Sequence, residues 1–184
     1  MGRCKKSALS VVKNSNLIHE KINQISQSRG IRKILFVCLG NLCRSPMAEY
    51  LLREKLKRKG ETDIEISSGG FLDQKGAHVP EEIYNLMKEV GIDISKHRSS
   101  PIDKERIMKS DLIIVMEVRQ EDQLVRLCPE EASRIFILSQ FDKENPIRRD
   151  VADPIGRSSS FYRNCYVDIN ALVEGLTEHI FKTH

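Results

Sequence analysis

The stretch Lys33–Pro46, KILFVCLGNLCRSP, decides the fold of this chain. An apolar run ends at Cys38, and Arg44 follows after five intervening residues. The run predicts a fully buried β-strand, and Pro46 fits the first turn of a helix because proline has no N–H to leave unpaired. Cys38 is therefore either a core thiol at the end of a strand or a nucleophile that faces a ligand held by the following loop.

Short apolar runs alternate with helical periods along the rest of the chain. Strands are predicted at 33–38, 64–68, 111–116 and 134–138, and helices after Pro46, around Ile83 and around Ile169. This alternation predicts a parallel sheet whose two faces are covered by helices. The expected fold class is therefore α/β, a single domain with a four-stranded parallel sheet and helices on both faces. Ligands of such folds bind beyond the carboxyl ends of the strands, where the quoted loop begins.

The first thirty residues differ from the rest because they are basic and contain one acidic residue, Glu20. A helical stripe ends before Gly30 and consists of Leu17, Ile18, Ile22 and Ile25. We expect 1–30 to be a basic N-terminal extension, helical or partly disordered, in front of a globular domain at 31–184. Gly2 and Cys4 would suit acylation, but Lys6 stands where the myristoylation pattern requires Ser or Thr, so no stable membrane association is expected.

The composition excludes several functional classes. A net charge of +4, from 30 basic and 26 acidic residues, suits anionic substrates and does not require nucleic acid. The five cysteines are odd in number and irregularly spaced, which argues against a disulfide framework and for a reducing, cytoplasmic location. No C-x-x-C or paired-histidine spacing occurs, so we expect no metal and no cofactor. The mild net charge leads us to expect no nucleic-acid partner.

The loop after the first predicted strand has the residue types of an anion site. Gly40 and Asn41 tolerate the left-handed backbone that lets successive N–H groups turn inward, and the N-terminus of a helix adds further unpaired N–H groups. Arg44 supplies a planar fork for two phosphate oxygens. The same field stabilises a thiolate, and Ser45 could donate a hydrogen bond to the sulfur. These features favour covalent attack by Cys38 on a tetrahedral oxyanion.

CLGNLCRSP, between a predicted strand and a predicted helix, resembles the phosphate loop of the low-molecular-weight protein tyrosine phosphatase family. The likeness continues through ISSGG (66–70), GIDISKHRSS (91–100), DLIIVM (111–116) and DVADPIGRSSSFYRN (150–164). The resemblance implies the flavodoxin-like fold of this family, with the phosphatase domain at 31–184. It also implies hydrolysis of protein phosphotyrosine and aryl phosphates through a phosphocysteine intermediate. The expected partner is a phosphorylated protein, and the expected state is a monomer or weak dimer.

The resemblance also assigns roles to single residues. Cys38 is the expected nucleophile, Arg44 the clamp on the phosphate, and Asp153 of the Asp153-Pro154 pair the general acid. Phosphate-binding residues are expected throughout the loop, namely Leu39, Gly40, Asn41, Leu42, Cys43, Arg44 and Ser45. Cys43 matches a second cysteine of the family, whose implied role is to capture oxidised Cys38 as a disulfide. The alternative for Cys43 is a small buried residue under the loop.

Substrate choice is less constrained by the sequence. The chain has no tryptophan, and Ile155-Gly156 follows Asp153-Pro154, which resembles the bacterial branch that also contains protein-arginine phosphatases. Those arginine phosphatases carry threonine where this chain has Leu42, and an apolar wall suits an aryl ring better than a phosphoguanidinium group. In the tyrosine-specific members of the family a tryptophan forms a second wall of the ring pocket, and Phe71 or Leu72 could take its place here. Phosphotyrosine is therefore favoured, with protein-arginine phosphatase activity as the alternative.

Two other functions remain open. Arsenate reductases share the fold and a similar loop, but their disulfide relay needs two further cysteines close together, and Cys128 and Cys165 are far apart in the sequence. The chain could also be a non-catalytic module that binds phosphorylated ligands, although the intact nucleophile, arginine and acid argue against it. Glu117 is expected to cap a helix, or to face the site. His97 and Tyr162 are expected at the surface, although His97, in SKHRSS, matches a position of structural character in the family that the chain resembles.

Overall fold

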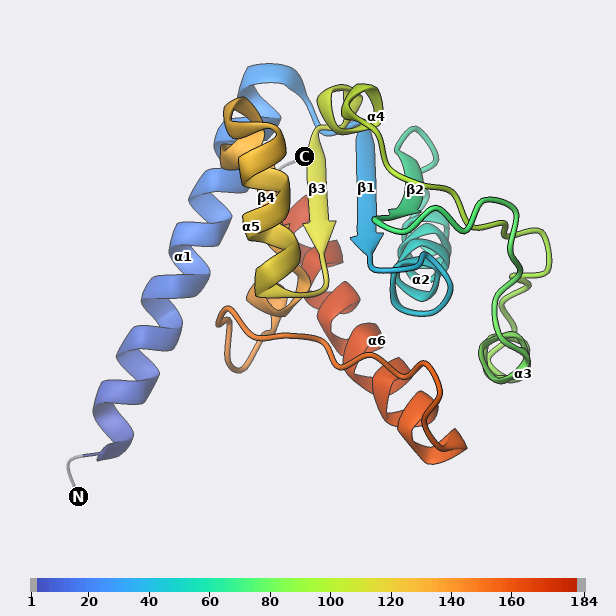
Figure 1. Ribbon diagram of the computed structural model, residues 1–184. Coiled ribbons are helices and arrows are strands. Elements are labelled where there is room, and N and C mark those ends of the chain that lie inside the picture. Colours follow the sequence, from blue (N-terminus) through green and yellow to red (C-terminus); the bar gives the residue numbers. More distant parts are fainter. Residues whose placement is uncertain (1–2, 182–184) are drawn as a thin grey trace.

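The computed structural model describes residues 3–181, and the side chains from residue 16 onward (Figure 1). Its four strands form one parallel sheet in the order β2-β1-β3-β4, which confirms the predicted single-domain α/β fold. The strands are β1 (Lys33–Cys38), β2 (Glu65–Gly70), β3 (Leu112–Val115) and β4 (Ile135–Ile137). The helices are α1 (Arg3–Arg29), α2 (Arg44–Arg58), α3 (Glu81–Glu89), α4 (Lys104–Lys109), α5 (Val118–Leu127) and α6 (Ser159–Phe181), with 3₁₀ helices η1 (Pro129–Arg134) and η2 (Leu138–Phe141).

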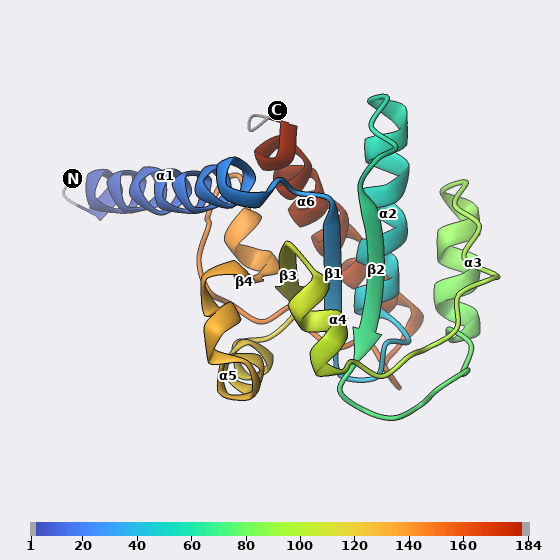
Figure 2. The same cartoon turned by 90° about the horizontal axis from the view of Figure 1, so that it is seen from above.

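Strands β1, β3 and β4 are almost entirely apolar because both faces of the sheet are buried, whereas the edge strand β2 has one large apolar side chain, Ile66. Successive side chains of a strand point to opposite faces, so Ile34 and Phe36 of β1 belong to one core cluster, and Leu35 and Val37 belong to the other. The larger cluster packs against α1, α2, α3 and α6, and the smaller one against α4 and α5. Figure 2 shows α5 and α6 on opposite sides of the sheet.

Helices α4 and α5 were not among the predicted helices. Each buries few apolar side chains among many charged ones: Ile107 is the buried residue of α4, and Gln120 and Leu124 are those of α5. Short segments of this kind carry a weak apolar period, and packing against the sheet stabilises them.

Helix α1 occupies most of the basic N-terminal extension, and its first half extends away from the rest of the chain (Figures 1 and 2). Its second half is part of the domain, because Ile18, Ile22 and Ile25 are buried in the larger core cluster. Leu17, placed on the same stripe by the sequence, is 51% exposed. Gly2 and the side chain of Cys4 lie outside the described residues. Between residues 3 and 181, none of the helices is both long and apolar enough to cross a membrane.

The sheet topology places the loop after β1 at a switch point. From β1 the chain continues to β2 on one side, and β3 and β4 lie on the other. Val37 pairs with Val115, so the residues that follow β1 and β3 emerge at the same edge. Cys38 and Glu117 are therefore neighbours in space, at the kind of edge where α/β folds bind ligands.

Candidate active site

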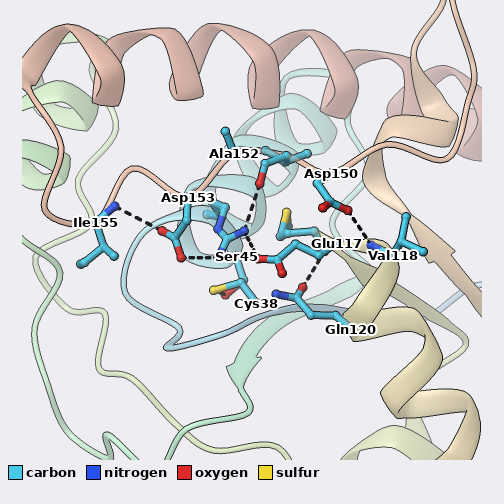
Figure 3. Close-up of polar contacts among 12 residues, drawn as sticks. Cys38, Ser45, Glu117, Val118, Gln120, Asp150, Ala152, Asp153 and Ile155 are labelled. Atoms are coloured by element: carbon cyan, nitrogen blue, oxygen red, sulfur yellow. Dashed lines mark hydrogen bonds and ion pairs between the residues drawn. The ribbon is translucent and has the colours of Figure 1, made fainter.

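The Cys38 sulfur lies at the end of β1, surrounded by hydrogen-bond donors. Its Sγ is 3.0 Å from Ser45 Oγ, at the start of α2 (Figure 3). It also accepts a hydrogen bond of 3.3 Å from the backbone N–H of Asn41. Such donors stabilise the thiolate form of a cysteine, which is the nucleophilic form. Cys38 is 2% exposed, yet it lines the pocket described below. It therefore combines the burial of a core residue with access to a ligand.

Asn41 fixes the loop from its centre. It adopts a left-handed backbone with φ of 54°, as the sequence predicted for this position. Its buried carboxamide donates to Ser45 Oγ at 3.0 Å and to Ser68 Oγ at 2.8 Å, and it accepts from the Ser100 N–H at 3.0 Å. The carbonyl oxygen of Asn41 lies 2.9 Å from His97 Nε2. These contacts tie the loop to β2 and to the segment before α4.

Gly70, the last residue of β2, lets the loop backbone approach the sheet. A Cβ atom at Gly70 would lie 2.9 Å from both Asn41 N and the Gly40 carbonyl carbon, and 3.0 Å from Leu39 O. These are backbone atoms, which cannot rotate away as a flexible side chain can. The glycine of the ISSGG segment is thus a requirement of the loop next to it.

Arg44 is a buried cation, 1% exposed, between two carboxylates. Its Nη1 donates to Glu117 Oε1 at 2.5 Å and to the Val151 carbonyl at 3.0 Å, and its Nη2 donates to Asp153. Figure 3 shows the Glu117 and Asp153 side chains converging near Ser45 and Cys38. Within the described part of the chain, Arg44 Nε has no hydrogen-bond partner, so its N–H is free to donate to a ligand oxygen.

Charge and burial set the titration of the groups around Arg44. Burial opposes the Arg44 charge, but the nearby Cys38 and Asp153 charges outweigh it and raise the pKa of Arg44. Burial, followed by the Cys38 charge, raises the pKa of Cys43 far above its ordinary value. Arg44 therefore stays charged, and Cys43 stays a neutral thiol.

Asp153 is held above the loop by a segment that follows the edge of the sheet. The Val151 N–H donates to Met116 O at 2.8 Å, and Asp150 Oδ1 accepts from the Val118 N–H at the start of α5 at 2.8 Å. The Ile155 N–H donates to Asp153 Oδ1 at 3.2 Å. The segment that carries Asp153 is thereby attached at the end of β3 and the beginning of α5, and Glu117 lies between these two elements.

The structure brings the three predicted catalytic residues together at one pocket. The lining residues are Cys38, Leu39, Gly40, Leu42, Cys43, Arg44, Leu72, Gln74, Asp153 and Ile155. Asn41 and Ser45 are fully buried behind this lining, where they hold the loop and contact the sulfur. Of the two candidates for the second wall, Leu72 lines the pocket, whereas Phe71 packs against the smaller core cluster.

The structure decides between the two expectations for Glu117 and corrects those for His97 and Tyr162. Glu117 takes the N-cap position of α5, but its side chain makes no capping bond and contacts Arg44 instead. His97 is 7% exposed and contacts the phosphate loop, and Tyr162 is 4% exposed and belongs to the core. The expectation that Glu117 faces the site came from its position directly after a buried strand, at the ligand-binding edge.

A nucleophile, a cation and a carboxylic acid around one pocket can transfer a phosphoryl group without a metal, since the arginine neutralises the charge and the acid protonates the leaving oxygen. Known proteins with similar sequences fit this chemistry. Residues 33–184 match the family described as low molecular weight phosphotyrosine protein phosphatase. The low molecular weight protein-tyrosine-phosphatase Ptp of Acinetobacter johnsonii is 31% identical over 149 residues, which cover 81% of this chain and 98% of that protein.

Two further similarities are to arginine phosphatases. The protein-arginine-phosphatase of Geobacillus stearothermophilus is 34% identical over 148 residues, covering 80% of this chain and 95% of that protein. A solved structure of the arginine phosphatase YwlE, a cysteine-to-serine mutant with a phosphorylated active-site serine, is similar with a TM-score of 0.76 and 26% identity. The match covers 82% of this chain and 96% of that one. The chain belongs to the low molecular weight phosphotyrosine protein phosphatase family.

Proposed function

We propose that this phosphatase hydrolyses protein phosphotyrosine, and aryl phosphates, through a phosphocysteine intermediate at Cys38. The observation that carries the proposal is the position of the Cys38 sulfur, between Ser45 Oγ and the Asn41 N–H, in a pocket that Arg44 and Asp153 also line. Phosphorylated proteins are the substrates that the family implies.

In the first step the Cys38 thiolate attacks phosphorus, and the phosphorus–oxygen bond to the substrate breaks as the phosphorus–sulfur bond forms. Asp153, in its protonated form, gives its proton to the departing phenolic oxygen. Arg44 exchanges its bond to Asp153 for bonds to the phosphoryl oxygens, and Glu117 keeps the guanidinium oriented during this exchange. The loop residues Leu39 to Ser45 surround the phosphoryl group.

In the second step water attacks the phosphocysteine and inorganic phosphate leaves. Asp153 now accepts a proton from the water, and the hydroxyl of Ser45 stabilises the departing thiolate. The related arginine phosphatase structure, with a phosphorylated serine in the active site of a cysteine-to-serine mutant, supports a covalent phosphoryl intermediate at this position.

The apolar pocket supports phosphotyrosine as the substrate. Leu42, Leu72 and Ile155 line it, and Leu72 is 45% exposed and Ile155 48% exposed. Aliphatic walls stabilise an aryl ring by removing apolar surface from water, and they offer no partner to a charged guanidinium. Protein-arginine phosphatase activity remains the second candidate, because the Geobacillus relative carries that name and Asp153 could pair with a guanidinium.

Turnover of matched phosphotyrosine and phosphoarginine peptides separates the two candidates. We expect wild type to prefer the phosphotyrosine peptide, and Leu42→Thr to shift the ratio of the two kcat/KM values toward phosphoarginine. The control is Leu127→Thr, an exposed leucine at the end of α5 that lies outside the pocket. Preference of wild type for phosphoarginine, with a further gain in Leu42→Thr, would reverse the substrate assignment.

Two further aspects of the function are part of the proposal. Cys43 is the redox partner of Cys38, since both thiols line the same pocket and both are free. A reducing, cytoplasmic location follows from the irregular cysteine pattern. Arsenate reduction is disfavoured because Cys128 and Cys165 belong to the core clusters on opposite faces of the sheet and do not form the close pair that a relay needs.

A further inference from the structure

The acid loop, residues 142–158, carries Asp153 and contains no helix or strand. A long irregular segment has many accessible backbone conformations, so its position must come from contacts made by particular residues. Direct contacts between the loop and the site are those of Val151, Asp153 and their neighbours with Arg44 and the end of β3. Arg149, four residues before Asp153, makes a second set of contacts, and it does not line the pocket.

The Arg149 side chain binds the loop to α6. Its Nη1 and Nη2 donate to the two carboxylate oxygens of Asp168 at 3.0 and 2.8 Å, which is the bidentate geometry of a strong arginine–carboxylate pair. Nη2 also lies 3.4 Å from Asp142 Oδ2, at the beginning of the loop. The hydrogen bond to Asp168 is the first cause of a raised pKa for Arg149. One guanidinium thus connects the start of the loop, its middle and the final helix.

The backbone of Arg149 is fixed at the same point. Its N–H donates to Ser139 Oγ at 3.0 Å, and its carbonyl oxygen accepts from the same hydroxyl at 2.6 Å. Ser139 is fully buried in η2, so this anchor belongs to the packed part of the domain. Both the side chain and the peptide groups of Arg149 are therefore held before the chain turns toward the site.

The residues between Arg149 and Asp153 determine where the general acid lies. Asp150 caps the first N–H of α5, Val151 pairs with Met116 and with Arg44, and Asp153 follows two residues later. A general acid works only within hydrogen-bond reach of the oxygen that it protonates, and a misplacement of about 1 Å can cost about 100-fold in rate. The position of the Asp153 carboxyl group thus depends on where the chain leaves Arg149.

We propose that Arg149 is a positioning residue for the general acid, acting on Asp153 through the backbone of the acid loop. The proposal rests on the proposed function, in which Asp153 protonates the leaving group. Loss of the Arg149–Asp168 pair removes no direct contact of Cys38, Arg44 or the phosphate loop, and Arg44 keeps its bond to Glu117. It impairs the protonation of the leaving group specifically.

The test compares two substrates that differ in their need for an acid. The p-nitrophenolate leaving group departs readily without a proton, whereas phenolate requires one. We would measure kcat/KM for p-nitrophenyl phosphate and phenyl phosphate with wild type, Arg149→Met, Arg149→Lys and Asp153→Asn. The matched control is Arg163→Met, which removes an exposed ion pair of α6 with Glu89, away from the acid loop. Thermal unfolding of each variant checks that the protein is folded.

Arg149→Met is expected to lose about tenfold more kcat/KM on phenyl phosphate than on p-nitrophenyl phosphate, in the same direction as Asp153→Asn and to a smaller degree. Arg149→Lys should recover part of this difference, and Arg163→Met should show none. Equal losses on both substrates in Arg149→Met, with a clear difference in Asp153→Asn, would overturn the proposal and leave the proposed function intact. Equal losses in Asp153→Asn as well would remove the acid role of Asp153, and the proposal with it.

Discussion

Arg44 Nη1 and Glu117 Oε1 lie 2.5 Å apart, although Arg44 begins the helix after β1 and Glu117 follows β3. The contact spans 73 residues of sequence and joins the loops at the ends of two neighbouring strands. Because it occupies Nη1, the Arg44 fork keeps one orientation whether its other nitrogen faces Asp153 or a phosphoryl oxygen. Glu117 thereby belongs to the proposed phosphate site.

Substituting Glu117→Gln should weaken phosphate binding, because a neutral amide orients the guanidinium less firmly than a carboxylate. We expect kcat/KM for p-nitrophenyl phosphate to fall about tenfold, or about 1.4 kcal/mol, and the inhibition constant of inorganic phosphate to rise in parallel. The control is Glu121→Gln, one turn further along α5, which pairs with Arg148 instead. Unchanged phosphate inhibition in Glu117→Gln would show that Arg44 needs no such partner.

Substituting Gly70→Ala should damage the phosphate loop, because the new methyl group would lie 2.9 Å from loop backbone atoms. Overpacking of this kind costs about 1–3 kcal/mol of folding free energy, and any relief must come from movement of the loop. We expect a lowered melting temperature together with a loss of kcat/KM of about tenfold or more. Ser67→Ala, on the same strand, serves as control. Full activity in Gly70→Ala would mean that the loop tolerates displacement.

The buried His97 should make the protein less stable in mild acid. Burial lowers the pKa of His97 below its ordinary value of 6.5. Below that pH the unfolded chain binds a proton at His97 that the folded protein does not, so the free energy of unfolding falls as pH decreases from 6.5 toward the folded-state pKa. Urea unfolding above and below this range should show a steeper fall for wild type than for His97→Gln. His78→Gln is the control, and equal pH dependence in wild type and His97→Gln would contradict this account.

Cys43 should protect Cys38 against irreversible oxidation. After peroxide treatment we expect wild type to regain most of its activity with dithiothreitol, because a Cys38–Cys43 disulfide is reducible whereas sulfinic and sulfonic acids are not. Cys43→Ser should regain several-fold less after the same exposure. Cys128→Ser, a buried cysteine in the other core cluster, controls for loss of a thiol elsewhere. Equal recovery in Cys43→Ser and wild type would assign Cys43 a packing role.

The sequence predicted the fold well because β1, β3 and β4 are apolar on both faces and helices alternate with the strands. The grouping of Cys38, Arg44 and Ser45 could also be predicted from the sequence, because one strand, one loop and the start of one helix determine their positions. Asp153 required the family resemblance, because an Asp-Pro pair in isolation is typical of a turn. The short helices α4 and α5 escaped prediction because charged residues outnumber the apolar ones that they bury.

The remaining features depend on contacts between distant segments. His97 follows a polar stretch typical of a surface loop, and its burial results from packing against Asn41, 56 residues away in the sequence. Glu117 stands at the N-cap position of α5. Its bond to Arg44 follows from the pairing of β1 with β3, which brings the two residues to the same edge of the sheet. Arg149 is one of many charged residues in its segment, and nothing local distinguishes its bidentate pair with Asp168 from a solvated side chain.

Trapping the covalent intermediate tests the central claim most directly. Wild type mixed with p-nitrophenyl phosphate would be quenched within the first turnovers, digested, and analysed by mass spectrometry for a phosphoryl group on the peptide that contains Cys38. We predict the phosphoryl group on Cys38, its accumulation in Asp153→Asn, and its loss together with all turnover in Cys38→Ala. Turnover that persists in Cys38→Ala, or a phosphoryl group on another residue, would contradict the account.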